Sequence, residues 1–170
     1  MDERRRRFEA QILPHLDAAH NLARWLSRSP TDAQDIVQEA MLRAYRGFDG
    51  LGEAPRPWLL AIVRNCWRDL ATRSARRGES ALTEAQADSL AAESVDPEQA
   101  AVGASQGRRL DALIAGLPAE FREALILREM EDLSYREIAE ITGAPIGTVM
   151  SRLARARALI KAAWPAEARP

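Results

Sequence analysis

The chain contains few of the residues that build disulfide frameworks and metal sites. Its 170 residues include one cysteine, Cys66, and two histidines, His15 and His20. A lone cysteine cannot form an intramolecular disulfide, so the sequence is not that of an oxidised secreted scaffold. These three residues also lack metal-ligand spacing, and we therefore expect neither a metal site nor a cofactor.

Long apolar stretches are missing as well. The longest unbroken aliphatic run covers residues 59–63, far too short to cross a bilayer. No apolar segment follows the charged amino terminus, so we expect no signal peptide and no membrane insertion, and we expect a cytoplasmic protein. Because no nucleophile–base pair or phosphate-binding loop is visible, we expect no catalytic residues and no enzymatic activity.

The net charge is only −1, but the charges are unevenly distributed. Residues 1–78 carry a net charge of +4 and residues 108–170 one of +1. Between them, residues 79–107 contain six acidic residues, no basic residue and no aromatic one. Such a composition is typical of a linker. We therefore predict two small domains, 1–78 and 108–170, joined by an acidic flexible linker over 79–107.

Two interpretations of the acidic linker remain open. Its acids can imitate nucleic acid in a basic channel or shield basic helices. The simpler interpretation, which we weigh slightly ahead, is a soluble tether. Thr83 and Gln86 have capping-box spacing, so part of the linker is predicted to be helical.

The first predicted domain is helical throughout, because no stretch alternates with the period-two pattern of a strand. An amphipathic helix is predicted over residues 8–28. A capping box at Thr31 and Gln34 is predicted to open a second helix. Glycines and prolines make residues 47–57 a loop, and a third helix is predicted from about Pro57 to Arg73.

The second predicted domain has the pattern of a helix-turn-helix. Ser134 and Glu137 form a capping box that opens a short helix. Gly143 ends that helix, and Pro145 is well placed to begin a longer one. A short helix, a turn containing glycine and a longer helix are the elements of this DNA-binding motif.

The longer helix has two contrasting faces. At 100° per residue, one narrow sector collects the apolar residues that we expect to be buried. They are Ile146, Val149, Leu153, Ala156 and Ile160. The opposite sector holds small and polar residues with Arg155, which suits a helix lying in a major groove. Arg152 and Arg157 lie nearer the buried flank, where phosphate contacts or intramolecular pairing are expected.

Several segments of the chain closely resemble extracytoplasmic-function (ECF) sigma factors. Residues 32–39, DAQDIVQE, resemble the polymerase-binding helix of that family, and residues 58–65, WLLAIVRN, resemble its promoter-opening helix. In the second domain the resemblance is carried by Leu117–Pro118, Leu127–Glu129, Leu133–Ala139 and Gly147–Leu153. Two motif sets in the family's order make the resemblance specific. It implies an all-α fold of two small helical domains.

The resemblance also implies a function. It implies a subunit that binds core RNA polymerase, directs it to promoter DNA and is controlled by an anti-sigma factor. The implied −10 contacts are Arg56, Arg64, Asn65, Arg68 and Arg73, and the implied −35 contacts are Gly147, Thr148, Ser151, Arg152 and Arg155. The implied polymerase contacts are Asp32, Asp35, Gln38 and Glu39.

The residue chemistry agrees with these assignments. Arg64 and Arg68 are four residues apart, on the face expected to lie opposite Cys66, where they can hold phosphates. The acidic helix is unsuited to DNA and suits a basic protein partner. Considered without the resemblance, that helix is better explained as a solvated face with favourable first-turn charges.

The sequence departs from the family pattern at three places. Met150 stands where many members carry a basic residue, and Ala154 stands where a larger ring is common. Pro55 and Pro57 bracket Arg56 in a loop that usually lacks this pair. A sigma-like decoy that binds only an anti-sigma factor is an alternative, which the basic residues of the last helix disfavour. A stand-alone helix-turn-helix repressor leaves the first domain unexplained.

Overall fold

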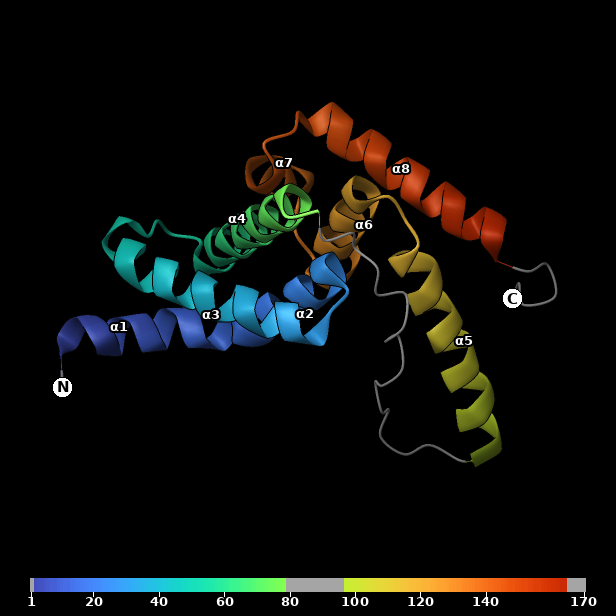
Figure 1. Ribbon diagram of the computed structural model, residues 1–170, viewed down its shortest axis with the longest axis horizontal. Coiled ribbons are helices and arrows are strands. Elements are labelled where there is room, and N and C mark those ends of the chain that lie inside the picture. Colours follow the sequence, from blue (N-terminus) through green and yellow to red (C-terminus); the bar gives the residue numbers. More distant parts are fainter. Residues whose placement is uncertain (1, 79–96, 165–170) are drawn as a thin grey trace.

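A computed structural model describes residues 2–78 and 97–164, with side chains from residue 103 onward in the second range. These residues form helices and no strand, which confirms the predicted all-α class (Figure 1). The helices are α1 (Glu3–Ile12), α2 (Leu16–Ser27), α3 (Pro30–Gly47), α4 (Pro55–Arg76), α5 (Pro97–Ala115), α6 (Ala119–Leu125), α7 (Tyr135–Thr142) and α8 (Ile146–Ala163). Within the described part of the chain, no helix has the length and apolarity needed to span a membrane.

The first predicted helix is wrong in one respect, because residues 8–28 do not form one continuous helix. A 3-10 turn, η1, covers Leu13–His15 and separates α1 from α2. Pro14 lies in this turn and has no backbone N–H to continue an α-helical ladder. Phe8, Ile12 and Leu22 from both pieces are nevertheless buried, so the predicted apolar stripe is retained.

The predicted capping box at Thr31 and Gln34 is also wrong. Ser29 is the N-cap of α3, and its Oγ accepts a hydrogen bond of 3.3 Å from the backbone N–H of Asp32. Pro30 occupies the first helical position, where its missing N–H has no cost. The helix therefore begins before Thr31, which lies exposed in the first turn. The third helix, α4, likewise begins at Pro55 rather than Pro57.

The capping box of the second domain is confirmed. The backbone N–H of Glu137 donates to Ser134 Oγ over 3.1 Å, and the N–H of Ser134 donates to the Glu137 carboxylate over 2.8 Å. Gly143 ends α7 with a φ of 69°, a left-handed conformation that glycine adopts without strain. Pro145 was predicted to be the first residue of the next helix. It is instead the N-cap of α8, which begins one residue later, at Ile146.

Ser134→Ala is expected to lower the free energy of unfolding by about 0.5–2 kcal/mol, because the first turn of α7 loses its side-chain acceptor. Urea titration measures the change. Thr31→Ala is the matched control, because Thr31 is a capping residue by pattern only, and its loss should stay within about 0.5 kcal/mol. Equal losses in the two variants would contradict the assignment of Ser134 as the cap.

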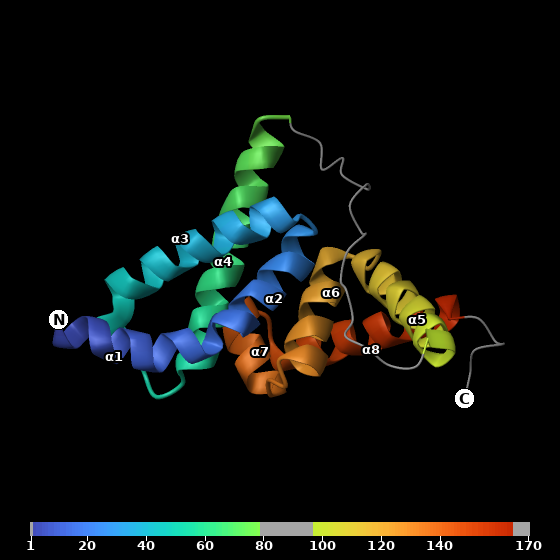
Figure 2. The ribbon, with the colours of Figure 1, turned by 90° about the horizontal axis from the view of Figure 1, so that it is seen from below.

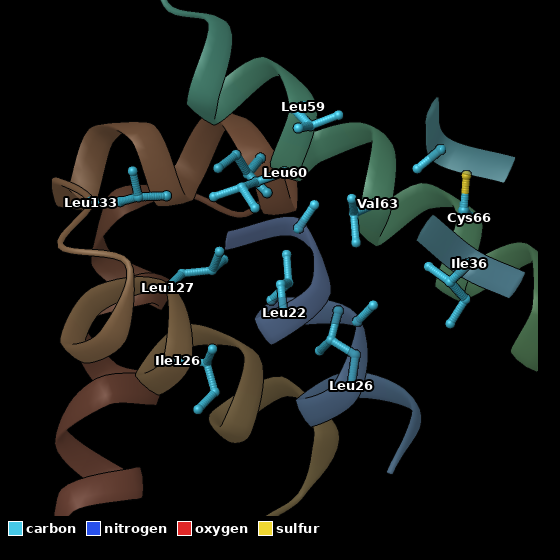
Figure 3. Close-up of a cluster of buried hydrophobic side chains, with 14 of the residues drawn as sticks. Leu22, Leu26, Ile36, Leu59, Leu60, Val63, Cys66, Ile126, Leu127 and Leu133 are labelled. Carbon is cyan, nitrogen blue, oxygen red and sulfur yellow. The ribbon is translucent and has the colours of Figure 1, made fainter. Parts of the chain in front are cut away.

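The two halves of the chain share one hydrophobic core. Leu22 of α2 and Leu60 of α4 lie in a cluster with Leu127 and Leu133 from the carboxy-terminal half, and each of these side chains is buried (Figure 3). α6 contacts α2 on one side and α8 on the other, while α4 contacts α7 (Figures 1 and 2). Small domains bury little of their own surface, and this packing adds to what each buries alone. We call it the closed arrangement.

The predicted linker falls partly within the described residues. Residues 97–107 belong to α5, so this end of the predicted linker is helical. The predicted capping box at Thr83 and Gln86 lies outside the described residues.

Candidate nucleic-acid interface

The outer face of α8 carries the predicted −35 contacts. Val149, Leu153 and Ala156 are buried against the rest of the domain, as the helical periodicity predicts. Ile160 is half-buried, but the prediction for Ile146 is wrong, because its side chain is 46% exposed at the first position of the helix. The face opposite the buried residues therefore points to solvent.

The five predicted −35 residues are not equally accessible. Gly147, Ser151 and Arg155 are exposed, whereas Thr148 and Arg152 are half-buried. Arg152 lies 3.4 Å from Glu120 of α6 in an ion pair. Arg157, the other arginine on the buried flank, pairs with Glu129. Intramolecular pairing, one of the two roles expected for these flank arginines, is the one seen here.

The predicted −10 contacts on α4 divide into two groups. Asn65, Arg68 and Arg73 are exposed, as a DNA-facing side chain should be. Arg64 was predicted on the same accessible face, and this is wrong, because only 9% of the residue is exposed. Its Nε instead donates to the Glu123 carboxylate of α6, which is also buried. The attraction between the two charges offsets the cost of burying them and places Arg64 against the second domain.

Arg56 makes a similar contact at the amino-terminal end of α4. Its guanidinium lies 2.6 Å from Glu131, a carboxylate that is only 4% exposed. Asn21 of α2 donates to the other oxygen of Glu131 over 2.7 Å. Glu131 follows a short π-helical turn, η3 (Ile126–Met130), whose wide i→i+5 hydrogen bond joins the N–H of Glu131 to the carbonyl of Ile126. Both oxygens of this carboxylate are thus used across the domain contact.

Arg122 is the most unusual charge in this region, because it is 5% exposed and its guanidinium donates to backbone carbonyls rather than to a carboxylate. Its Nη1 donates to the carbonyls of Ala115 and Leu117, each over 3.0 Å, and its Nη2 reaches the carbonyl of Leu26 over 3.5 Å. Ala115 and Leu26 lie at the carboxyl ends of α5 and α2, where the helix dipole favours a cation. Burial lowers the pKa of Arg122, and nearby Arg28 lowers it further.

A groove of about 440 Å³ separates the two sets of DNA-binding candidates. Arg64, Trp67 and Arg68 of α4 line one side, and Thr148 and Arg152 of α8 line the other. Residues predicted to contact two different promoter elements therefore face each other across a single groove.

The predicted polymerase-binding residues lie together on α3. Asp35 and Gln38 are exposed, and Asp32 and Glu39 are half-buried. Glu39 pairs with Arg43 over 2.7 Å, and Arg43 also pairs with Asp69 of α4 over 2.7 Å. Hydrogen bonds to these two carboxylates raise the pKa of Arg43. The exposed Asp35 and Gln38 therefore form an accessible polar edge of α3.

The remaining titratable candidates are structural. Cys66 is buried, and burial raises the pKa of its thiol, so the thiol is held in its unreactive neutral form. Burial and the neighbouring Arg56 lower the pKa of His15. Among the residues that the structure describes, no group of histidine, cysteine and acidic side chains is arranged to hold a metal ion.

Comparison with known proteins assigns each half of the chain to a family region. The family model described as Sigma-70 region 2 matches residues 12–77, and the one described as Sigma-70, region 4 matches residues 107–160. An ECF RNA polymerase sigma-E factor of Haemophilus influenzae is 36% identical over 148 residues, covering 82% of this chain and 77% of the relative. The chain belongs to the ECF RNA polymerase sigma factors.

Two further sigma factors extend the comparison. SigE of Mycolicibacterium smegmatis, an ECF RNA polymerase sigma factor, is 36% identical over 151 residues. The match covers 88% of this chain but only 58% of that relative's length. The sigma factor RpoE of Bartonella quintana, solved in complex with the anti-sigma factor NepR, superposes with a TM-score of 0.71 at 28% identity. That match covers 91% of this chain and 94% of the other.

Sequence reasoning missed the residues that hold this ECF sigma factor closed. Glu123, Glu131 and Asn21 were not singled out, and Glu131 and Asn21 look like ordinary surface residues from their local sequence. One signal was present, since Arg122 and Glu123 interrupt an otherwise apolar stretch around Phe121 and Leu125. Charges at core positions indicate buried pairs, although their partners in α2 and α4 cannot be read from local spacing.

Proposed function

We propose that this ECF sigma factor directs core RNA polymerase to specific promoters. The observation that carries the proposal is the match of the two halves to Sigma-70 region 2 and region 4, with exposed basic residues on α4 and on α8. The carboxy-terminal domain, 108–170, would read the −35 element, and the amino-terminal domain, 1–78, would read and open the −10 element. Residues 79–107 would connect them. The polymerase supplies the chemistry, in the cytoplasm, and this chain supplies the sequence recognition.

The −35 contacts that we propose lie on α8. Gly147 and Ser151 leave room for close approach, and Arg155 reaches a base edge, since arginine bonds bidentately to guanine. Thr148 and Arg152 become available as the groove opens. On α4 the accessible −10 contacts are Asn65, Arg68 and Arg73, joined by Arg56 and Arg64 once they leave their carboxylates. On α3, Asp32, Asp35, Gln38 and Glu39 form the proposed polymerase-binding edge.

The closed arrangement is unsuited to promoter binding. Elements at −10 and −35 lie about 25 base pairs apart, which is about 85 Å of B-DNA at 3.4 Å per pair. Arg64 and Arg68 lie across one groove from Thr148 and Arg152, so the two reading faces cannot reach both elements at once. The domains must therefore separate when the chain joins polymerase and promoter.

An anti-sigma factor is the proposed regulator. The similar sigma factor from Bartonella quintana was solved with the anti-sigma factor NepR. A protein that binds the closed arrangement of this chain would keep Arg56 and Arg64 paired with Glu131 and Glu123. By linkage, such a partner lowers the fraction of chain available to DNA.

Run-off transcription with purified core polymerase and a promoter library tests the proposal. The expected result is a defined set of transcripts that depends on this chain. No promoter-dependent transcript, together with tight binding of a purified anti-sigma factor, would instead favour the decoy function.

Arg155→Ala is expected to reduce discrimination at one −35 base pair by about 1–3 kcal/mol, because a bidentate contact to guanine is lost. Competition binding of the holoenzyme to single-base promoter variants measures it. Arg157→Ala is the matched control, since Arg157 is paired with Glu129 on the buried flank and should leave discrimination unchanged. A uniform loss across all sequences would place Arg155 on a phosphate.

A further inference from the structure

The accessible surface of α8 includes apolar side chains to which the proposed DNA contacts assign no role. Ile146 is 46% exposed, Met150 is 51% exposed, and Ala154 is also exposed. The three residues are spaced by four positions, so their side chains form one line along the helix surface. We call this line the apolar ridge.

The apolar ridge is not used by the fold of the described residues. The side chains that α8 buries are Val149, Leu153 and Ala156. Ile146 borders this buried sector at the exposed start of the helix, and Met150 and Ala154 lie progressively farther from it. The groove between the domains is lined by Thr148 and Arg152 of α8, and no ridge residue takes part in it. The apolar ridge is therefore accessible even in the closed arrangement, where an external ligand can reach it.

The charges around the apolar ridge indicate which ligand that is. Helix α8 carries Arg152, Arg155, Arg157 and Lys161 and no acidic residue between Ile146 and Ala163. This basic helix is complementary to the phosphates of double-stranded DNA. In the major groove of DNA, the apolar group that base pairs present is the C5-methyl of thymine. An apolar line on a basic recognition helix thus has one matching partner on its ligand.

We propose that the apolar ridge reads thymine methyl groups in the −35 element, with Met150 as the principal contact. This inference rests on the proposed function. Met150 lies in the amino-terminal half of α8, the part of a recognition helix that reaches base edges. Its long, flexible and polarisable side chain can cover a methyl group, and Ile146 and Ala154 extend the apolar surface on either side. A lysine at the same position would contact phosphate instead.

Deoxyuridine substitution tests the inference, because it removes the methyl group of thymine and leaves the base pairing intact. The probe is a −35 duplex selected from a promoter library, bound by holoenzyme assembled from the full chain and core polymerase. Each thymine is replaced in turn. We expect about fourfold weaker binding at one or two positions, since burying one methyl-sized group contributes about 0.8 kcal/mol.

Variants assign the methyl contact to the apolar ridge. Met150→Ala should bind thymine and deoxyuridine duplexes equally. Met150→Lys should also lose the methyl effect, and its binding should fall more steeply with salt, by about 0.9 in the log–log slope for one added phosphate contact. Leu159→Ala is the matched control, because Leu159 is a comparably exposed apolar residue of α8 outside the ridge and should keep the full methyl effect.

The outcomes separate the inference from the proposed function. If the holoenzyme prefers particular −35 sequences, but no thymine-to-deoxyuridine change weakens binding, the inference is overturned and the proposed function stands. A methyl effect that survives in Met150→Ala and in the Ile146→Ala, Met150→Ala double variant would overturn it as well. If the holoenzyme selects no promoter sequence at all, the proposed function itself fails.

Discussion

Glu123→Ala is expected to open the chain. The substitution leaves the Arg64 guanidinium buried at the domain contact without its carboxylate, and breaking a buried pair in this way costs about 3–5 kcal/mol. The chain can avoid that cost by separating its domains, which returns Arg64 to water. Small-angle X-ray scattering should record a larger radius of gyration, and affinity for non-specific DNA should rise because Arg64 becomes available.

Two control variants distinguish opening from general damage. Glu140→Ala removes one partner of an exposed pair with Arg136 and should change stability by at most about 0.5 kcal/mol. The double variant Arg64→Met, Glu123→Leu removes both charges and keeps apolar volume, and it should restore the closed arrangement. Unchanged scattering of Glu123→Ala would show that this pair does not hold the domains together.

Arg122→Ala is expected to cause the largest loss of stability, about 3–5 kcal/mol in the free energy of unfolding. The guanidinium donates to the carbonyls of Ala115, Leu117 and Leu26, and each hydrogen bond to a charged group contributes about 1.5–3 kcal/mol. Its removal leaves buried carbonyl oxygens without donors. The cost of burying the charge offsets part of this gain, which is why the expected loss is below the sum. Urea unfolding of the full chain measures it.

Two further arginine variants locate the origin of that loss. Arg122→Met keeps most of the side-chain volume and removes the hydrogen-bond donors. It should therefore be more stable than Arg122→Ala by the packing contribution alone, and less stable than the unaltered chain. Arg136→Ala removes an arginine that is 83% exposed and should be nearly neutral. An Arg122→Met variant as stable as the unaltered chain would contradict a hydrogen-bonding role for this guanidinium.

Under the proposed function, DNA phosphates can replace the two ion pairs that join the domains in the closed arrangement. Arg64 and Arg56 each bind a carboxylate of the second domain, and a phosphate offers the same kind of charged oxygen acceptor. Buried ion pairs contribute little net stability compared with apolar packing. The exchange of carboxylate for phosphate therefore leaves neither guanidinium unpaired, while Glu123 and Glu131 are exposed to water as the domains separate. This exchange suits the proposed opening of the chain at a promoter.

The sequence by itself determined the local structure and the family. The helical periodicity of the buried face of α8, the capping box of Ser134 and Glu137 and the end of α7 at Gly143 depend on residues a few positions apart, and these were predicted correctly apart from Ile146. The two errors in the first domain also have local causes. Pro14 interrupts the helix that the apolar pattern predicts over residues 8–28, and Ser29 caps α3 in place of Thr31.

Only the tertiary structure decided which of these predicted contacts are free. Arg64 and Arg68 are equivalent by spacing, yet one is buried on Glu123 and the other is exposed. That difference arises from residues 59 positions apart in the chain. Ile146 was predicted to be buried from its helical angle, but it lies at the end of α8, where the domain no longer covers it. Burial depends on which surfaces pack together, and helical spacing does not contain that information.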